Sequence, residues 1–229
     1  MIKLIPGSKP KSIKVYSLFS VEQKELDTFL QENLHTGQIC PFKSPMATLV
    51  FFIKEKNSSL WLIQDYWALS SIMVKNKYSL SLISELVSQL HRAKYFTKLN
   101  VHWGFNNVHI KPRDKWKTTF HTNYSLFKPL VIFFKMTNSL ATFQMIMNNI
   151  FRDLITKGIV VVYLDNILIF IRTVKQYTKT TQRVLEILVE HKLCLCLEKC
   201  EFQKEHIKYL GLVVSENKIS IDSIKVAGV

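Results

Sequence analysis

The chain has 229 residues, of which 48% are apolar and 12% aromatic, so it can bury a sizeable core and is not a disordered, collagen-like or low-complexity protein. Its 31 Lys and Arg residues against 17 Asp and Glu give a formal net charge of +14. That charge excludes an acidic binding module and favours an anionic partner, most simply nucleic acid, although a ribosome or a membrane surface would also serve.

The cysteines and the apolar segments favour a reducing, intracellular setting. The four cysteines are too few and too clustered for the disulfide framework of a small secreted domain. Residues 1–19 carry four lysines and no acid, and they contain no apolar stretch of signal-peptide length. The longest apolar stretch, 159–171, is shorter than the ~20 residues of a membrane span and is interrupted by Asp165.

Apolar spacing predicts both helices and strands. The first helix opens with a capping-box pattern at Ser20 and Gln23, and all the helical stripes are interpreted as core faces. Because the two kinds of element alternate irregularly and include hairpins, we expect an α+β fold, an antiparallel sheet backed by helices. The predicted helices are 20–37, 82–90, 139–157 and 184–189, and the predicted strands are 49–54, 60–66, 95–101, 116–122, 130–134, 159–164, 167–171 and several short ones within 193–220.

The positive charge is concentrated in one segment. Residues 91–135 hold nine Lys and Arg against one acid, Asp114, whereas residues 192–229 hold six Lys against five acids. A localised basic stripe predicts where phosphates would lie. The alternative is a solvated basic face with no partner.

The clearest local pattern is a hairpin within 159–171. Two β-branched runs flank Asp165 and Asn166, and these two residue types tolerate the positive φ that tight hairpin turns need. On spacing alone, the alternative is that this pair is only a turn.

The residues around this turn, Tyr163-Leu-Asp-Asn, are similar to the Tyr-x-Asp-Asp hairpin of reverse transcriptases, and ordered matches extend over nearly the whole chain. The chain resembles the fingers and palm of the polymerase of a Ty3/gypsy-type LTR retrotransposon, as a degenerate copy. The other matching segments are Pro6-Gly-Ser-Lys-Pro, Ser44-Pro with Leu49-Val-Phe-Phe-Ile-Lys, Asp65-Tyr-Trp-Ala-Leu, Val74-Lys-Asn-Lys-Tyr, Leu82-Ile-Ser-Glu-Leu, Ala93-Lys-Tyr-Phe-Thr-Lys-Leu, Trp116-Lys-Thr, Thr137-Asn, Ala141-Thr-Phe-Gln, Leu197-Glu-Lys-Cys-Glu-Phe and Leu210-Gly.

The resemblance implies a domain plan. Residues 1–45 would form a basic arm and the first fingers helix, and residues 46–94 the fingers. Residues 95–229 would form the palm, with a fingers insertion near 106–130 and the start of the thumb or connection. The matches end near Ile221, so we expect most of the thumb to be missing.

The resemblance also implies templated DNA synthesis on an RNA or DNA primer-template, from deoxynucleoside triphosphates, by a two-Mg²⁺ mechanism. The family holds the metals with three aspartates, and the matching positions here are Asn100, Asp165 and Asn166. An amide oxygen can ligate a metal but brings no negative charge. We therefore expect weakened or lost Mg²⁺ binding, and a pseudoenzyme rather than an active polymerase.

Further site residues follow from the resemblance. Phe105 matches the steric gate against ribonucleotides, Trp61 and Trp67 replace arginines, and Lys135 replaces a glycine near the nucleotide. For Phe105 and Tyr163, an ordinary core or pocket-wall aromatic remains the alternative. Nucleotide contacts are expected at Phe105, Trp61, Phe134 and Lys135, and nucleic-acid contacts at Tyr163, Gln144 and Lys208.

Two other functions remain open. One is a non-catalytic, basic nucleic-acid-binding protein derived from a retrotransposon. The other is a zinc site, although its spacing matches neither a zinc knuckle nor a zinc finger. Its candidate ligands are Cys194, Cys196 and Cys200 with His191 or His206.

Overall fold

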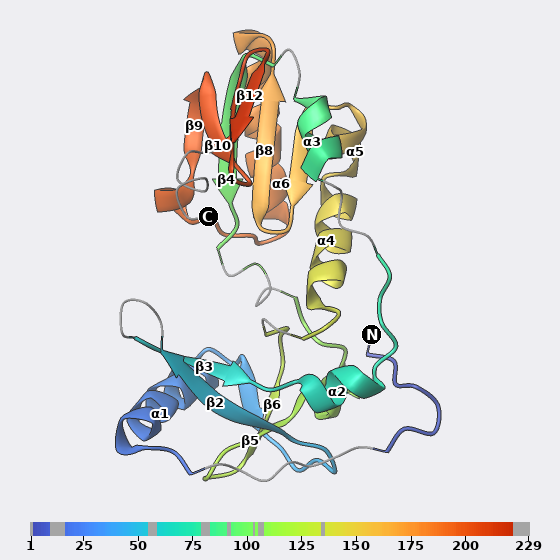
Figure 1. Cartoon of the computed structure of the whole chain (residues 1–229), viewed down its shortest axis with the longest axis vertical. Coiled ribbons are helices and arrows are strands. Elements are labelled where there is room, and N and C mark those ends of the chain that lie inside the picture. Colours follow the sequence, from blue (N-terminus) through green and yellow to red (C-terminus); the bar gives the residue numbers. More distant parts are fainter. Residues whose placement is uncertain are drawn as a thin grey trace. The chain divides into compact units, whose positions relative to one another are not determined.

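The computed structural model describes most of the chain and divides it into two compact units (Figure 1). Unit 1 comprises Met1–Asn76 and Phe105–Ser139, and unit 2 comprises Lys77–Gly104 and Leu140–Val229. The first division between the units falls after Asn76, and the expected fingers–palm boundary after residue 94 stays a prediction. The described residues are 2–9, 17–54, 59–78, 83–90, 93–102, 104, 108–133 and 136–221.

Unit 1 is built on a five-stranded sheet. In spatial order its strands are β1 (Ile39–Pro41), β6 (Leu126–Pro129), β5 (Phe120–His121), β2 (Thr48–Lys54) and β3 (Leu60–Gln64). All neighbours are antiparallel except β2 and β5, which run parallel. The predicted first helix is confirmed as α1 (Ser20–His35), and its buried Leu26 and Leu30 share a core with Phe120 and Phe127 of the sheet.

Two local predictions in unit 1 need correction. The predicted capping box of Ser20 and Gln23 does not form, because the N-cap is Phe19, whose side chain has no acceptor, and only the Glu22 carboxylate bonds back, accepting the Phe19 N–H at 2.9 Å. The predicted strand 116–122 is confirmed only at β5 (Phe120–His121), because its first three residues belong to a 3₁₀ helix, η2 (Pro112–Thr118). Proline favours the first turn of a helix, and the Thr118 hydroxyl donates back to the Lys115 carbonyl at 2.9 Å, so local bonds replace a strand ladder.

Other boundaries in unit 1 shift by a few residues. The strand predicted at 130–134 lies earlier, as β6, and is followed by a single bridge between Val131 and His109. A short helix that we did not predict, α2 (Trp67–Ile72), follows β3. The Asp65 carboxylate accepts the Trp67 N–H at 2.9 Å and so satisfies one donor at the start of that helix.

A buried ion pair between Asp114 and Lys117 binds the backbone of Ile2, near the beginning of the chain. Asp114 is 2% exposed, and its carboxylate accepts the Ile2 N–H at 2.9 Å and a bond from Lys117 Nζ at 2.6 Å. Lys117 Nζ also donates to the Ile2 carbonyl at 2.6 Å. Burial opposes ionisation of Asp114, but the bonds from Lys117 and Ile2 outweigh it and hold the pKa of this carboxyl below its ordinary value.

Unit 2 contains two sheets and most of the helices. The larger sheet has the order β7 (Val160–Tyr163), β8 (Asn166–Ile171), β4 (Tyr95–Asn100) and β9 (Glu201–Lys204), and all its pairings are antiparallel. The smaller sheet is β10 (His206–Tyr209), β11 (Leu212–Ser215) and β12 (Lys218–Ile221). The helices are α3 (Ile83–Gln89), α4 (Ser139–Ile150), α5 (Arg152–Thr156), α6 (Val174–Glu190) and the 3₁₀ turn η3 (Leu197–Lys199).

The larger sheet has packed elements on both faces. Helix α6 lies along β8 and β4 (Figure 1), and the hydroxyls of Thr97 and Tyr177 are 2.7 Å apart. Alternate residues of β4 and β8, such as Phe96 and Leu168, share a buried core with Leu86 of α3 and with strands β10 and β11. The mixture of helices and mainly antiparallel strands confirms the predicted α+β class.

Several helix and strand predictions in unit 2 need correction at their ends. The predicted third helix is interrupted at Phe151, which separates α4 from α5, and Gly158 with φ +63° follows as predicted. The fourth helix begins at Val174, earlier than the predicted 184. Within 193–197 only Leu195 forms a strand-like contact, a bridge to Val101. None of the described helices is long and apolar enough to cross a bilayer.

The predicted hairpin forms, but its turn lies one residue earlier than expected. Tyr163 pairs with Asn166, so the turn residues are Leu164 and Asp165. Leu164 adopts φ +54°, a conformation that costs a branched side chain about 1–2 kcal/mol. The surrounding structure must therefore hold this turn firmly.

The side chain of Gln144 in α4 forms hydrogen bonds to the backbone of the hairpin beside its turn. It is 1% exposed, and its Oε1 accepts the Leu164 N–H at 2.7 Å. Its Nε2 donates to the Val162 carbonyl at 2.9 Å and to Asn148 Oδ1 at 2.8 Å. These bonds explain the position of the turn, because they favour a bend at Leu164 rather than after Asp165.

Replacing Asp114 by Asn should lower the free energy of unfolding of unit 1 by about 3 kcal/mol near neutral pH, because it breaks a buried ion pair. Since the native pKa is lowered, the wild-type carboxylate stabilises the fold above pH ~4 and loses this contribution as the pH falls through the native pKa. The variant should therefore show a weaker loss of stability in acid. Urea unfolding at several pH values, followed by tryptophan fluorescence, measures both effects. Asp153→Asn, an exposed carboxylate, is the control, and equal stability of the two variants would contradict the prediction.

Replacing Gln144 by Leu should destabilise unit 2 by about 2 kcal/mol, because the Leu164 N–H loses its partner while the side-chain volume is nearly kept. Hydrogen exchange should accelerate most in the hairpin 160–171. Mass spectrometry of exchanged peptides measures this, with Gln182→Leu on the exposed face of α6 as control. Unchanged protection of the hairpin would show that Gln144 does not hold the turn.

Candidate functional site

The three positions expected to form a metal site lie together in unit 2. Asn100 ends β4, Asp165 lies in the hairpin turn, and Asn166 begins β8. The antiparallel register places Asn100 directly opposite Asn166. The Val101 N–H also donates to the Asp165 carbonyl at 2.8 Å, so two distant stretches of backbone meet here.

The three side chains bond to one another in a closed triangle, which we call the amide–carboxylate triangle. Asn100 Nδ2 donates to Asp165 Oδ2 at 3.1 Å and to Asn166 Oδ1 at 3.3 Å. Asn166 Nδ2 donates to Asp165 Oδ1 at 3.0 Å. Both oxygens of the only carboxylate therefore already accept amide protons.

This arrangement does not fit a pair of magnesium ions. Two-metal sites hold their ions about 3.5–4 Å apart between shared, negatively charged oxygen ligands. The triangle supplies one negative charge, and its two amide groups point N–H donors at that charge. Across the residues that the structure describes, no group of three or more His, Cys, Asp or Glu side chains could hold a metal ion.

The same observation bears on the zinc site. Cys194 is exposed, Cys196 and Cys200 are half-buried, and all three are free thiols. They do not form a metal-binding group with the neighbouring histidines in the described part of the chain. Instead, Cys200 accepts the Asn100 N–H through Sγ at 3.5 Å and donates to the Cys196 carbonyl at 3.2 Å.

Three further residues that we did not predict surround the triangle. Tyr209 Oη donates to the Asn166 carbonyl at 3.5 Å, and burial, with a smaller contribution from the Asp165 charge, raises the pKa of Tyr209 above its usual range. Lys98, two residues before Asn100 and on the same face of β4, forms an ion pair with Glu201 of β9. The period-two pattern of β4 could have identified Lys98, but nothing local could have identified Glu201 or Tyr209.

The remaining expected contact residues belong to several different elements. Tyr163 is half-buried and lies opposite Asn166, while Lys208 is exposed on β10 and its carbonyl accepts a bond from Lys98. Gln144 is buried, and all its described bonds are to the protein. Trp61 belongs to unit 1, on β3, and is 44% exposed. Phe105, Phe134 and Lys135 lie outside the described residues.

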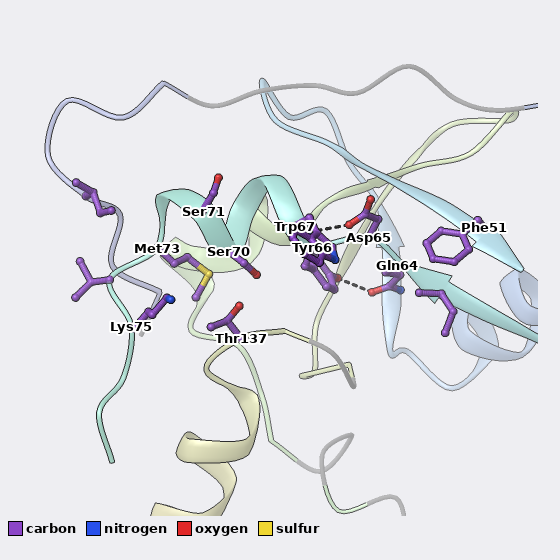
Figure 2. A pocket seen from close by; sticks show the side chains of 13 residues that line it. Phe51, Gln64, Asp65, Tyr66, Trp67, Ser70, Ser71, Met73, Lys75 and Thr137 are labelled. Atoms are coloured by element: carbon purple, nitrogen blue, oxygen red, sulfur yellow. Dashed lines mark hydrogen bonds between the residues drawn. The ribbon is translucent and has the colours of Figure 1, made fainter. Parts of the chain in front are cut away.

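A cavity of about 890 Å³ in unit 1 is a second candidate site (Figure 2). Phe51 and Gln64 lie toward one end of it and Lys75 toward the other, as Figure 2 shows. Trp67, on its wall, is 85% exposed. Gln64 accepts a bond from Tyr66 Oη through Oε1, whereas its buried Nε2 has no partner within the described structure. The cavity thus combines aromatic surface with a few polar groups, as ligand sites commonly do.

Comparison with known proteins identifies relatives over nearly the whole chain. The retrovirus-related Pol polyprotein from transposon 297 of Drosophila melanogaster is 30% identical over 227 residues, which are 97% of this chain and 21% of the relative. The Tf2-7 polyprotein of Schizosaccharomyces pombe is 28% identical over 204 residues, 89% of this chain and 15% of the relative. The chain therefore spans about a fifth, or less, of these curated relatives.

Solved structures share the fold. A foamy viral protease-reverse transcriptase in complex with dsDNA gives a TM-score of 0.87 at 19% identity, covering 99% of this chain and 48% of that chain. The foamy viral enzyme in complex with an RNA/DNA hybrid gives 0.86 at 19% identity, covering 95% of this chain and 29% of that chain. These likenesses confirm the predicted fingers and palm fold.

A family described as "Reverse transcriptase (RNA-dependent DNA polymerase)" matches residues 5–214. This match includes the triangle, the hairpin and the strands of both sheets of unit 2 up to β11. The chain belongs to the reverse transcriptase family, and its relatives are retrotransposon polyproteins of the Ty3/gypsy type.

Proposed function

We propose that this chain is a reverse transcriptase domain that binds nucleic acid without extending a primer. The observation that carries the proposal is the amide–carboxylate triangle of Asn100, Asp165 and Asn166, which has one carboxylate where the family uses three. Unit 1 would correspond to the fingers and unit 2 to the palm. The segment 77–94 then belongs with the palm, in place of the boundary that the sequence suggested.

In the family, two bound metal ions stabilise the transition state of nucleotidyl transfer. A metal clamp contributes several kcal/mol of transition-state stabilisation, and each ~1.4 kcal/mol is a factor of ten in rate. Loss of two negatively charged ligands at Asn100 and Asn166 therefore removes most of the rate acceleration. Mg²⁺ binding at Asp165 is weakened for the same reason, since both of its oxygens already accept N–H donors.

Nucleotide binding is impaired independently of the metals. Trp61 replaces an arginine of the family, and an indole cannot donate the paired hydrogen bonds that a guanidinium gives to phosphate. Lys135 replaces a glycine at the expected nucleotide position. Phe105, with Phe134, stays a proposed pocket residue. We therefore propose that deoxynucleoside triphosphates bind weakly.

Nucleic-acid binding is supported by charge and by exposed aromatic surface. The described part of the basic segment includes Lys111 and Arg113, both exposed, at the start of η2. In the cavity of unit 1, the exposed Trp67 indole and Phe51 offer stacking surfaces for bases, an interaction that tolerates any sequence. The foamy viral relatives of the same fold have been solved with an RNA/DNA hybrid and with dsDNA. An RNA or DNA primer-template is accordingly the proposed partner.

The purified chain should not extend a primer on an RNA or DNA template with Mg²⁺ or Mn²⁺. Its rate should equal that of Asp165→Ala, because the lone carboxylate cannot assemble the metal pair. Gel-based primer extension with radiolabelled primer measures this directly. Extension by the wild-type chain clearly above Asp165→Ala would refute the proposal.

The chain should bind primer-template with an affinity that falls steeply with salt, because released counterions drive binding to phosphates. The double variant Lys111→Ala/Arg113→Ala should reduce the slope of log K against log[salt] by about 1–2 units. Fluorescence anisotropy over a salt series measures the slope. Lys175→Ala/Lys179→Ala on α6 removes the same charge elsewhere and is the matched control. A salt-independent affinity would exclude the nucleic-acid-binding function.

A further inference from the structure

We infer that the amide–carboxylate triangle is a structural latch that stabilises this end of unit 2 without a divalent metal. It fastens the end of β4 to the β7–β8 turn through side-chain bonds alone. The inference concerns the stability of the site, so it stands or falls separately from nucleic-acid binding.

The three side chains lie within hydrogen-bond distance of one another, so their charges decide whether they attract or repel. If all three were carboxylates, their charges would repel one another, and the repulsion would be relieved by a bound cation or by protonation of one of them. Here the polar atoms of Asn100 and Asn166 lie 3.0–3.3 Å from their partners in the triangle. Because amide N–H groups face carboxylate and carbonyl oxygens at those distances, each contact attracts.

Both oxygens of the Asp165 carboxylate accept a hydrogen bond within the triangle. Asp165 Oδ2 accepts from Asn100, and Oδ1 accepts from Asn166. Asn100 Nδ2 makes a second bond, to Asn166 Oδ1, which closes the ring. A divalent cation at Asp165 would compete with these N–H donors and would meet one negative charge in place of three, so the latch opposes metal binding.

The backbone around the latch is fixed by independent contacts that also need no metal. Gln144 holds the turn at Leu164 and Val162, and Tyr209 donates to the Asn166 carbonyl. The Val101 N–H bonds to the Asp165 carbonyl. The unusual φ of +54° at Leu164 is therefore maintained from several directions by the protein itself.

Thermal unfolding with and without divalent cation tests the latch. The midpoint of the wild-type chain should be the same in EDTA and in millimolar Mg²⁺. The double variant Asn100→Asp/Asn166→Asp should melt about 4–8 °C lower in EDTA and recover with Mg²⁺, because three carboxylates then depend on a cation. Asn123→Asp/Asn149→Asp, two exposed positions, changes the net charge equally and should show no cation dependence.

Two companion measurements keep the test decisive if the double variant does not fold. The single variant Asn166→Asp should show the same effect in weaker form. Isothermal titration with Mn²⁺ should detect no saturable binding by the wild-type chain and measurable binding by Asn166→Asp. The inference is overturned if Mg²⁺ raises the wild-type midpoint and Asp165→Asn abolishes that rise. Equal stability of wild type and Asn166→Asp in EDTA would overturn it too. Neither result depends on primer extension, so failure of the latch and failure of the proposed function are distinguishable.

Discussion

The antiparallel pairing of β4 with β8 is the contact on which the site depends. Its register places Asn100 opposite Asn166, and the adjacent Val101 N–H bonds to the carbonyl of Asp165 in the turn. A shift of this register by one residue would send alternate side chains to the other face of the sheet and separate the triangle. The buried apolar residues of both strands, such as Phe96 and Leu168, hold the register, because they have to face the core.

Given that register, the chemistry of the site is decided by the side chains at three positions. A nitrogen in place of an oxygen at Asn100 and at Asn166 changes the geometry little, but it turns two acceptors into donors. The same backbone that would bring carboxylates together for metal binding now brings complementary groups together. The strand pairing is therefore compatible with amides at these positions, whereas the negative charge that a metal pair would need is reduced.

The sequence predicted the convergence of the three positions because the hairpin has strong local signals and the family resemblance supplied its distant partner. It did not predict the turn position, since that depends on Gln144, a buried residue of another helix. The strand predicted at 116–122 begins too early for a similar reason, because the Pro112 start and the Thr118 hydroxyl favour a 3₁₀ helix over its first residues. The partners Glu201 and Tyr209 come from far along the chain, where no periodicity points to β4.

The contacts that stabilise the fold lie mostly outside the three positions of the triangle. The cores of the two units consist mainly of apolar residues outside the triangle, and the strained turn is supported by bonds from Gln144, while Tyr209 bonds to the adjacent Asn166 carbonyl. Substitutions at Asn100 and Asn166 create no cavity and leave no buried charge unpaired, which are the usual causes of large losses of stability. The half-buried end of this well-packed sheet can thus hold amides in place of carboxylates without loss of the fold, because the amides bond to the remaining carboxylate.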